Sequence, residues 1–355
     1  MKILSVTGQR YSFLLLLGII PALSFFSCFF DAEYPLQNDR PSCSIEHIAT
    51  TLYYPESSVC TLQISDRNDA ELAVTILPCS ISINDSMYCD TFTTLPWPGS
   101  YTFLKTGYDT KLLHLSLDTN KMGWFRGILR FTDEAGAALE IPYAINKIFR
   151  DPFDVYPFSD KNWHCYLSDD SAYCRFDYID KKLLFTFPMS DDTSTSAHST
   201  GIRSRFTFPS DFYTTIDFKL RDEMDDAFEV YFFISSSPDT GRWDGKKAGF
   251  FISGTNGRLR LECRSINLQS YSFESGITAG QLGISRKDSI VSYFFHDGNP
   301  AATPKPLTSQ MYPDTLPVFI HLKMSVKDLK KDRNCSWNNF VLVEGEIIFP
   351  DDDLE

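Results

Sequence analysis

Short runs in which apolar and polar residues alternate recur along the chain after residue 30, while stretches with helical periodicity are scarce. Alternation with a period of two places every second side chain on the same face of a strand, so the pattern predicts β-strands. Gly, Pro, Asn and Asp bound these runs, as turns between strands require. The chain is therefore predicted to be all-β.

The first folded region is predicted to span residues 42–148. Alternating leucines at 113–117 indicate one strand, and residues 128–131 lead through an acidic and glycine-containing turn at 133–136 into residues 139–145. The last two runs predict a hairpin. About seven strands in about 105 residues is the size of an immunoglobulin-like β-sandwich.

A linker is predicted at residues 149–158, because two prolines and three charged residues within residues 150–157 interrupt any strand. Residues 159–350 follow with longer and more aromatic strands. Residues 228–234 are almost wholly apolar, as a central strand covered on both faces would be. Residues 351–355 form an acidic tail.

Several motifs of the second region resemble those of concanavalin A-like lectin/glucanase jelly rolls. Residues 204–218 resemble the "R-F-x-x-x-G-D-F-x-x-x-V-D-F" opening, although Pro209-Ser210 replaces the usual glycine; residues 248–252 with 259–261, and residues 319–324, resemble later strands. The resemblance implies a jelly-roll sandwich that binds or hydrolyses carbohydrate. Residues 127–143 resemble the last hairpin of bacterial surface Ig-like modules, BACON-type domains among them.

Residues 1–27 have the layout of an export signal. Lys2 and Arg10 precede an apolar run at 13–20, and no acidic residue is present. The stretch Leu23-Ser24-Phe25-Phe26-Ser27-Cys28 resembles a relaxed bacterial lipoprotein box of the spirochaete kind. It predicts cleavage before Cys28, a lipid on that cysteine and a tether at residues 28–41.

Two alternatives remain for this segment. Ordinary signal peptidase could cut after Ala22-Leu23-Ser24, which has the small-x-small pattern, and the protein would then be secreted. Alternatively, residues 13–30 could stay as an uncleaved anchor, at the short end of what spans a bilayer. All three alternatives place the remaining chain outside the cytoplasm, in or beyond the cell envelope.

Charge excludes some partners. The 355 residues carry a formal net charge of −13, and without residues 1–27 there are 31 basic and 46 acidic residues. A chain this acidic is repelled by phosphate backbones, which argues against nucleic acid as a partner.

Eight of the nine cysteines lie after residue 28 and are predicted to form disulfides within each region. Spacing does not determine the connectivity, and some of these cysteines could be buried thiols. Short loops favour Cys79–Cys89 and Cys165–Cys174, which leaves Cys43–Cys60 and Cys263–Cys335. No C-x-x-C pair suggests zinc.

A glucanase would need two carboxylates flanking the scissile bond. The nearest candidates are Glu223, in a segment that reads as a turn, and Glu229, in an apolar strand. Their spacing does not match an E-x-D-x-x-E motif. Motifs of serine hydrolases, zinc proteases and P-loop enzymes are absent from the sequence. Catalysis is therefore not the leading hypothesis.

Candidate ligand-binding residues are Trp243, Tyr293 and His296, with Phe294 beside them, because aromatic rings stack on the apolar faces of sugars. Tyr293 and Phe294 could instead be core residues. No cofactor is expected, although a structural calcium between Asp239 and Asp244 is a further candidate. A basic set would favour an acidic glycan or could simply be a solvated face: Arg258, Arg260, Arg264, Lys219 and Lys323.

The sequence thus predicts a cell-envelope lipoprotein, anchored to a membrane through Cys28, whose C-terminal jelly roll binds carbohydrate without catalysis. A glycoside hydrolase of the glucanase type is the alternative. A structural lipoprotein or adhesin that binds a surface protein is the third hypothesis.

Overall fold

A computed structural model describes the chain over the following residues: 39–66, 71–77, 81–83, 86–88, 100–104, 111–117, 119–153, 161–167, 175–178, 182–189, 198–220, 228–238, 247–255, 258–264, 270–275, 278–297, 305–327, 329–330 and 332–349. Every regular element within these ranges is a strand, which confirms the all-β prediction. No helix in this part of the chain is long and apolar enough to cross a membrane.

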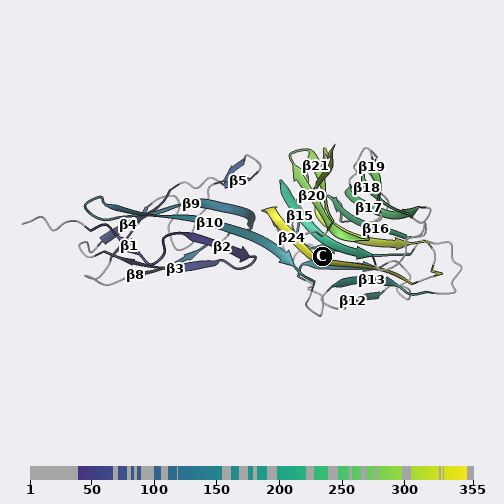
Figure 1. Cartoon of the computed structure of the whole chain (residues 1–355), viewed down its shortest axis with the longest axis horizontal. Coiled ribbons are helices and arrows are strands. Elements are labelled where there is room, and N and C mark those ends of the chain that lie inside the picture. Colours follow the sequence, from purple (N-terminus) through teal and green to yellow (C-terminus); the bar gives the residue numbers. More distant parts are fainter. Residues whose placement is uncertain are drawn as a thin grey trace, which may run out of the picture.

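Ten strands make up the N-terminal unit (Figure 1). A three-stranded sheet of order β1-β3-β8 lies over strands that belong to a larger sheet, in the order β10-β9-β4-β7 with β2 beside β10. The strands are β1 (Ser42–Cys43), β2 (Ile48–Tyr53), β3 (Ser58–Ser65), β4 (Glu71–Leu77), β5 (Ile81–Ile83), β6 (Ser86–Tyr88), β7 (Ser100–Leu104), β8 (Lys111–Ser116), β9 (Lys121–Thr132) and β10 (Ala138–Asp151).

The predicted hairpin is confirmed as β9 and β10, which pair from Ala138↔Thr132 onward. In its turn, Asp133 accepts a hydrogen bond of 2.7 Å from the Ala137 amide through its carboxylate, and Gly136 adopts a φ of 89°. A residue with a side chain is strained at that φ, which explains the glycine. Apolar side chains from both sheets, among them Leu62, Phe131 and Ile145, form a core of their own.

Fourteen strands make up the C-terminal unit, in two facing sheets. The first is a seven-stranded sheet of order β11-β14-β23-β16-β17-β18-β19. The second belongs to the larger sheet and has the order β22-β21-β20-β15-β24, with β13 beside β24 and β12 beside β13. The strands are β11 (Trp163–Leu167), β12 (Arg175–Tyr178), β13 (Leu183–Phe187), β14 (His198–Ser204), β15 (Phe212–Leu220), β16 (Phe228–Ser235), β17 (Lys247–Thr255), β18 (Arg258–Arg264), β19 (Ser270–Ser275), β20 (Ala279–Lys287), β21 (Ile290–His296), β22 (Lys305–Met311), β23 (Phe319–Val326) and β24 (Arg333–Glu346).

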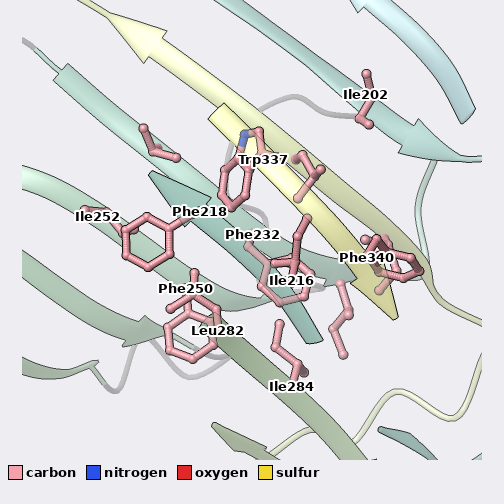
Figure 2. Close-up of a cluster of buried hydrophobic side chains, with 14 of the residues drawn as sticks. Ile202, Ile216, Phe218, Phe232, Phe250, Ile252, Leu282, Ile284, Trp337 and Phe340 are labelled. Carbon is pink, nitrogen blue, oxygen red and sulfur yellow. The ribbon is translucent and has the colours of Figure 1, made fainter. Parts of the chain in front are cut away.

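The two sheets of this unit enclose a second and larger core. Rings and branched side chains from β15, β16, β17, β20 and β24 interdigitate between them, including Phe218, Phe232, Phe250 and Trp337 (Figure 2). Strand β16 is the fourth of seven strands, so its predicted central position is confirmed, but it is not covered on both faces as expected, because Glu229 and Tyr231 lie partly exposed on the outward face. The two-sheet sandwich predicted for this region is therefore present.

The boundary between the units differs from the predicted linker. Residues 149–151 belong to β10, which continues out of the N-terminal unit and pairs with β24 through Phe149↔Leu342 and Arg150↔Val341. Phe149 packs against Phe206 with 5.1 Å between ring centroids. One sheet of twelve strands thus runs through both units.

Two of the expected disulfides are corrected by the structure. Cys43 and Cys60 are free thiols, and so are Cys263 and Cys335, each of which is buried in the core. Burial raises the pKa of the Cys263 thiol to about 12 and also raises that of Cys335. The other two expected pairs involve Cys79, Cys89 and Cys174, which lie outside the described residues, as does Cys28.

Candidate functional site

The outward face of the seven-stranded sheet carries charged side chains that contact one another and aromatic rings. The alternation of side chains along β16 shows which residues reach this face. The even-numbered residues of this strand, from Phe228 to Ile234, point into the core, and its odd-numbered residues Glu229, Tyr231 and Phe233 point outward. We call the outward side chains of β14, β16, β17, β18 and β23, together with Lys327, the cationic face.

Strand register arranges this face in transverse rows. Antiparallel pairing sets Tyr231 opposite both Lys323 and Phe251, and Phe251 opposite Glu262. Neighbouring strands are about 4.8 Å apart, so side chains within a row touch. The rows read Glu229–Ser253–Arg260, then Lys323–Tyr231–Phe251–Glu262, then Arg203–His321–Phe233–Gly249–Arg264.

Gly249 allows β16 and β17 to approach each other closely in the third row. A Cβ at this position would collide with the carbonyl oxygen of Phe232 and with the Cα and Cβ of Phe233. A glycine in a strand interior often marks such a close approach. Gly249 is therefore required for β17 to lie this close to β16 at Phe233.

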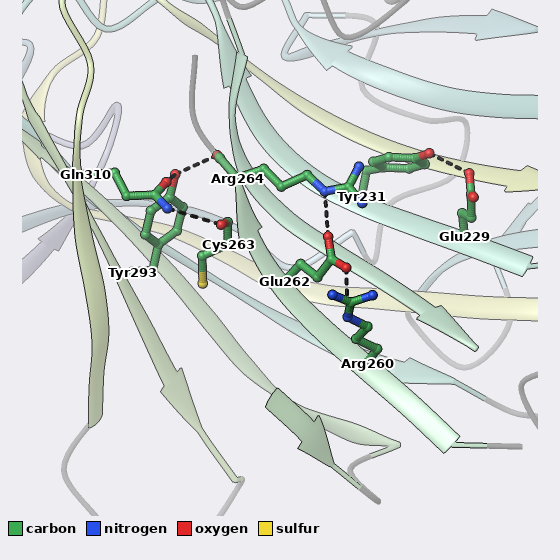
Figure 3. A network of polar contacts seen from close by, with 8 residues as sticks. All are labelled: Glu229, Tyr231, Arg260, Glu262, Cys263, Arg264, Tyr293 and Gln310. Atoms are coloured by element: carbon green, nitrogen blue, oxygen red, sulfur yellow. Dashed lines mark hydrogen bonds and ion pairs between the residues drawn. The ribbon is translucent and has the colours of Figure 1, made fainter. Parts of the chain in front are cut away.

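One buried carboxylate holds two arginines at the edge of this face. Glu262 contacts Nε of Arg260 at 2.8 Å with Oε1 and accepts a hydrogen bond from Nε of Arg264 at 2.6 Å with Oε2 (Figure 3). The Glu262 side chain is 4% exposed, whereas those of Arg260 and Arg264 are 43% and 31% exposed. The buried charge thus fixes the position of two guanidinium groups that solvent reaches.

Aromatic rings lie beneath several of the cations. The guanidinium of Arg264 sits 3.8 Å from the centroid of the Phe251 ring, and Nζ of Lys323 sits 5.8 Å from that of Tyr231. In the same way, Nζ of Lys247 lies 5.8 Å from the centroid of the Phe233 ring, and the guanidinium of Arg203 lies 5.0 Å from that of the Phe319 ring. Cation–π contacts of this kind restrict the motion of long side chains.

Glu229, a catalytic candidate from the sequence, is engaged at both oxygens. The Tyr231 hydroxyl donates to Oε2 at 2.7 Å, and the ammonium group of Lys327 lies 3.2 Å from Oε1. Burial and the hydrogen bond to Glu229 raise the pKa of Tyr231, so its hydroxyl keeps its proton. Glu229 therefore lies on the predicted strand as a paired carboxylate.

His321 lies fully buried in the third row, with its ring stacked on Phe233 at 4.6 Å and 5°. Its pKa is lowered to about 3, first by burial and then by the positive charges of Arg203, Lys247 and Lys323. A backbone interaction with Ser237 partly opposes this effect. Burial is thus the main cause of the lowered pKa, and the three neighbouring cations add to it.

The sign of the face is opposite to that of the chain. Among the described outward side chains of these five strands and Lys327, six cations outnumber two carboxylates, Glu229 and Glu262, which is a formal charge of +4 on a chain of −13. The cations are Arg203, Lys247, Arg260, Arg264, Lys323 and Lys327. Lys247 is buried, while the other five cations are at least partly exposed and favour an anionic ligand at this face.

Tyr293, a candidate ligand-binding residue for which the core was the stated alternative, is a core residue with no exposed surface. Its hydroxyl lies 2.7 Å from the carbonyl oxygen of Arg264, and the Gln310 amide donates to the carbonyl oxygen of Cys263 at 3.3 Å (Figure 3). Both side chains come from the opposite sheet. They fix the backbone of β18, the strand that carries both arginines.

The other predicted residues are distributed differently. His296 lines a cavity on the opposite sheet, and Lys219 also belongs to that sheet, away from the arginines. Trp243, Glu223, Asp239 and Asp244 lie outside the described residues. Within the described ranges, no group of three or more His, Cys, Asp or Glu residues could hold a metal ion.

Lys247, Lys327, His321 and Arg203 were missed as members of the site. Their outward positions follow from alternation once the strands are known. What links them is strand pairing between segments more than 70 residues apart, as in Arg203↔His321. Sequence alternation alone contains no information about that register.

No known family model and no curated protein matches the chain. Solved structures similar to it include a glycoside hydrolase family 16 endo-glucanase from Bacteroides ovatus, at 10% identity and a TM-score of 0.41, covering 56% of this chain and 99% of that one. An endo-1,3-beta-glucanase from Thermotoga petrophila matches at 9% identity and 0.42, covering 55% and 96%. Lectin II from Ulex europaeus matches at 9% and 0.40, covering 56% and 98%. These neighbours have concanavalin A-like lectin and glucanase folds.

Proposed function

We propose that the protein binds an acidic polysaccharide on the cationic face of its C-terminal unit and does not cleave it. The observation that carries this proposal is the formal charge of +4 on one aromatic sheet face of a chain whose net charge is −13. The motifs that resemble lectin/glucanase jelly rolls support carbohydrate as the ligand class.

Carboxylated sugars match the geometry of the face. Arg260 and Arg264 are held by the same carboxylate, and a guanidinium has five N–H donors in a planar fork that fits carboxylates. Because Glu262 and Phe251 already restrain Arg264, less conformational entropy is lost when a ligand binds it. A polyuronate presents carboxylates at regular intervals along such a face.

The carboxylates of the face favour binding over hydrolysis. Glu229 and Glu262 lie two strands and two residues apart, which places their Cα atoms about 12 Å from each other. A glycosidase needs one carboxyl group that can donate a proton and a second that can attack the sugar or activate water. Each of these carboxylates is also paired with cations or a hydroxyl group, which disfavours a role as general acid.

The proposal places the protein in the cell envelope. The basic n-region, the apolar run and the stretch ending at Cys28 support export and a lipid on that cysteine. The protein would then be tethered to a membrane and would hold an extracellular acidic glycan there.

The test is binding of the full chain, in mild detergent, to polygalacturonate and to the same polymer with its carboxylates methyl-esterified. We expect saturable binding to the free acid, at least tenfold weaker binding to the ester, and no new reducing ends after incubation. Exposed charge pairs are screened by salt, so the affinity should fall as salt rises.

A double variant identifies the face. Arg260→Gln with Arg264→Gln should weaken polygalacturonate binding at least tenfold, while the control Arg126→Gln with Arg130→Gln removes the same charge from exposed positions of β9 and should change it less than twofold. Equal loss in both variants, equal binding of the ester, or equal affinity for double-stranded DNA would contradict the proposal. Release of reducing ends would indicate a hydrolase.

A further inference from the structure

A cavity of about 420 Å³ lies in the C-terminal unit on the sheet opposite the cationic face. Its size is within the range of small-molecule sites. Strands β15, β20, β21 and β24, with the residue that precedes β13, supply its walls. The lining includes Lys182, Asp217, Lys219, Gln281, His296 and Asn338.

Four of these residues form one transverse row across four strands. Asn338 of β24 pairs with Asp217 of β15, Asp217 with Gln281 of β20, and Gln281 with His296 of β21. Because cross-strand neighbours lie on the same face, two amides, a carboxylate and an imidazole line up. Asp217, Gln281 and Asn338 lie tens of residues apart in the sequence, so only the fold brings them into one row.

Asp217 is fixed in this row by two amide groups. The Gln281 amide donates to Oδ1 at 2.9 Å, and the Asn339 amide donates to Oδ2 at 2.8 Å. Each carboxylate oxygen can accept a second hydrogen bond. The carboxylate is therefore a preorganised acceptor that has capacity for a ligand hydroxyl.

Asn339 is oriented in turn by the N-terminal unit. Nη2 of Arg150, near the end of β10, donates to its Oδ1 at 2.8 Å. Arginine can only donate and an ionised aspartate can only accept, so the two contacts require the same orientation of the Asn339 amide. Asn339 has a φ of 47° at an irregularity in the pairing of β15 with β24, which turns its side chain toward both partners.

An aromatic side chain, Phe294, lies one row further along the sheet than His296, and Tyr213 lies one row beyond it. Phe294 is half-buried on the same face as His296, and its ring packs on Tyr213 edge to face at 5.5 Å. Gly283 lies opposite Phe294 and carries no side chain to cover it. Rows on one face are about 7 Å apart, within the length of a sugar ring and its substituents.

We propose that this cavity is a second carbohydrate site, which takes a neutral hexose residue. Sugar hydroxyls both donate and accept hydrogen bonds, and the lining offers acceptors in Asp217 and Gln281 and donors in Asn338 and the two lysines. Asp217 at the centre of the row repels a carboxylate placed there, and with Lys182 and Lys219 the lining carries a formal charge of +1, against +4 on the cationic face. Arg150 acts as a positioning residue that fixes Asn339 and, through it, Asp217.

The test uses the full chain with methyl β-D-glucopyranoside, methyl β-D-galactopyranoside and methyl α-D-mannopyranoside, measured by saturation-transfer NMR and calorimetry. We expect at least one glycoside to bind saturably and at least tenfold more weakly to Asp217→Ala. Arg150→Gln should weaken glycoside affinity about two- to fivefold, because it removes the hydrogen bond that orients Asn339 and no contact with the ligand. Glu140→Ala, which removes the same charge from an exposed position of β10, should bind like the wild type.

Gln281→Ala is the second variant and decides the outcome if Asp217→Ala does not fold. Absence of saturable binding by all three glycosides, or unchanged affinity in the folded variants, overturns the proposal. Failure of this site is distinguishable from failure of the proposed function. Polygalacturonate binding should survive Asp217→Ala, and glycoside binding should survive the double variant Arg260→Gln with Arg264→Gln.

Discussion

The buried histidine of the cationic face should make the stability of the protein depend on pH. The pKa of His321 is lowered from 6.5 to about 3 in the folded state, so between these values the unfolded chain binds a proton that the folded chain does not. Stability is therefore highest above pH 6.5 and falls as the pH is lowered toward 3. At pH 5 the loss from this residue is about 2 kcal/mol, from 1.36 kcal/mol per pH unit below 6.5.

The variant His321→Phe isolates this effect. A phenylalanine ring retains the stack on Phe233 and removes the titrating group. Urea unfolding at pH 7.5 and pH 5 should show that the variant loses about 2 kcal/mol less than the wild type across this interval. The carboxylates are common to both proteins, so their contribution cancels in the comparison.

The control is His47→Gln, at an exposed position of the N-terminal unit, which should follow the wild type at both pH values. Parallel pH profiles for the wild type and His321→Phe would refute the reasoning. So would an NMR titration in which His321 takes up its proton near pH 6.5. Either result would mean that burial and the three neighbouring cations do not act on the ring as inferred.

Three further predictions concern the fold and the site. Gly249→Ala should lower the free energy of unfolding by roughly 3 kcal/mol or prevent folding, because its Cβ would collide with β16; Gly283→Ala, where the nearest atom would be at 3.2 Å, should cost less, and equal melting temperatures would contradict this. Cys263 and Cys335 should resist iodoacetamide in the native protein and react after denaturation without reductant, as mass spectrometry can show; a disulfide would leave both unlabelled. Glu229→Gln should cost less than about 1 kcal/mol, because Lys327 is 60% exposed, and should leave polygalacturonate binding intact, so a tenfold loss of affinity would argue against a purely pairing role.

Local pattern was sufficient for the strands and for some faces. The turn at residues 133–136 and the apolar run of β16 were recognisable because their signals lie within a few neighbouring residues. The outward position of Glu229 likewise follows from alternation. These features depend on short-range geometry, which sequence periodicity reports.

Features that depend on distant pairing were not predictable. The strand β10 continues through Asp151 because residues 340–342 of β24, about 190 residues later, supply its partner. Tyr293 remained a candidate both for the binding surface and for the core, because alternation does not tell which face of a strand is inward. Cysteine spacing predicted pairs that the sandwich keeps as separate thiols, since spacing says nothing of three-dimensional distance.

The salt dependence of polygalacturonate binding tests the central claim most directly. If Arg260 and Arg264 contact the polymer, the logarithm of the affinity should fall linearly with the logarithm of the salt concentration in the wild type. The slope should be smaller by up to about two in the double variant Arg260→Gln with Arg264→Gln, about one for each lost cation. An identical slope in the two proteins, or an affinity that salt does not change, would contradict the assignment of the cationic face as the glycan site.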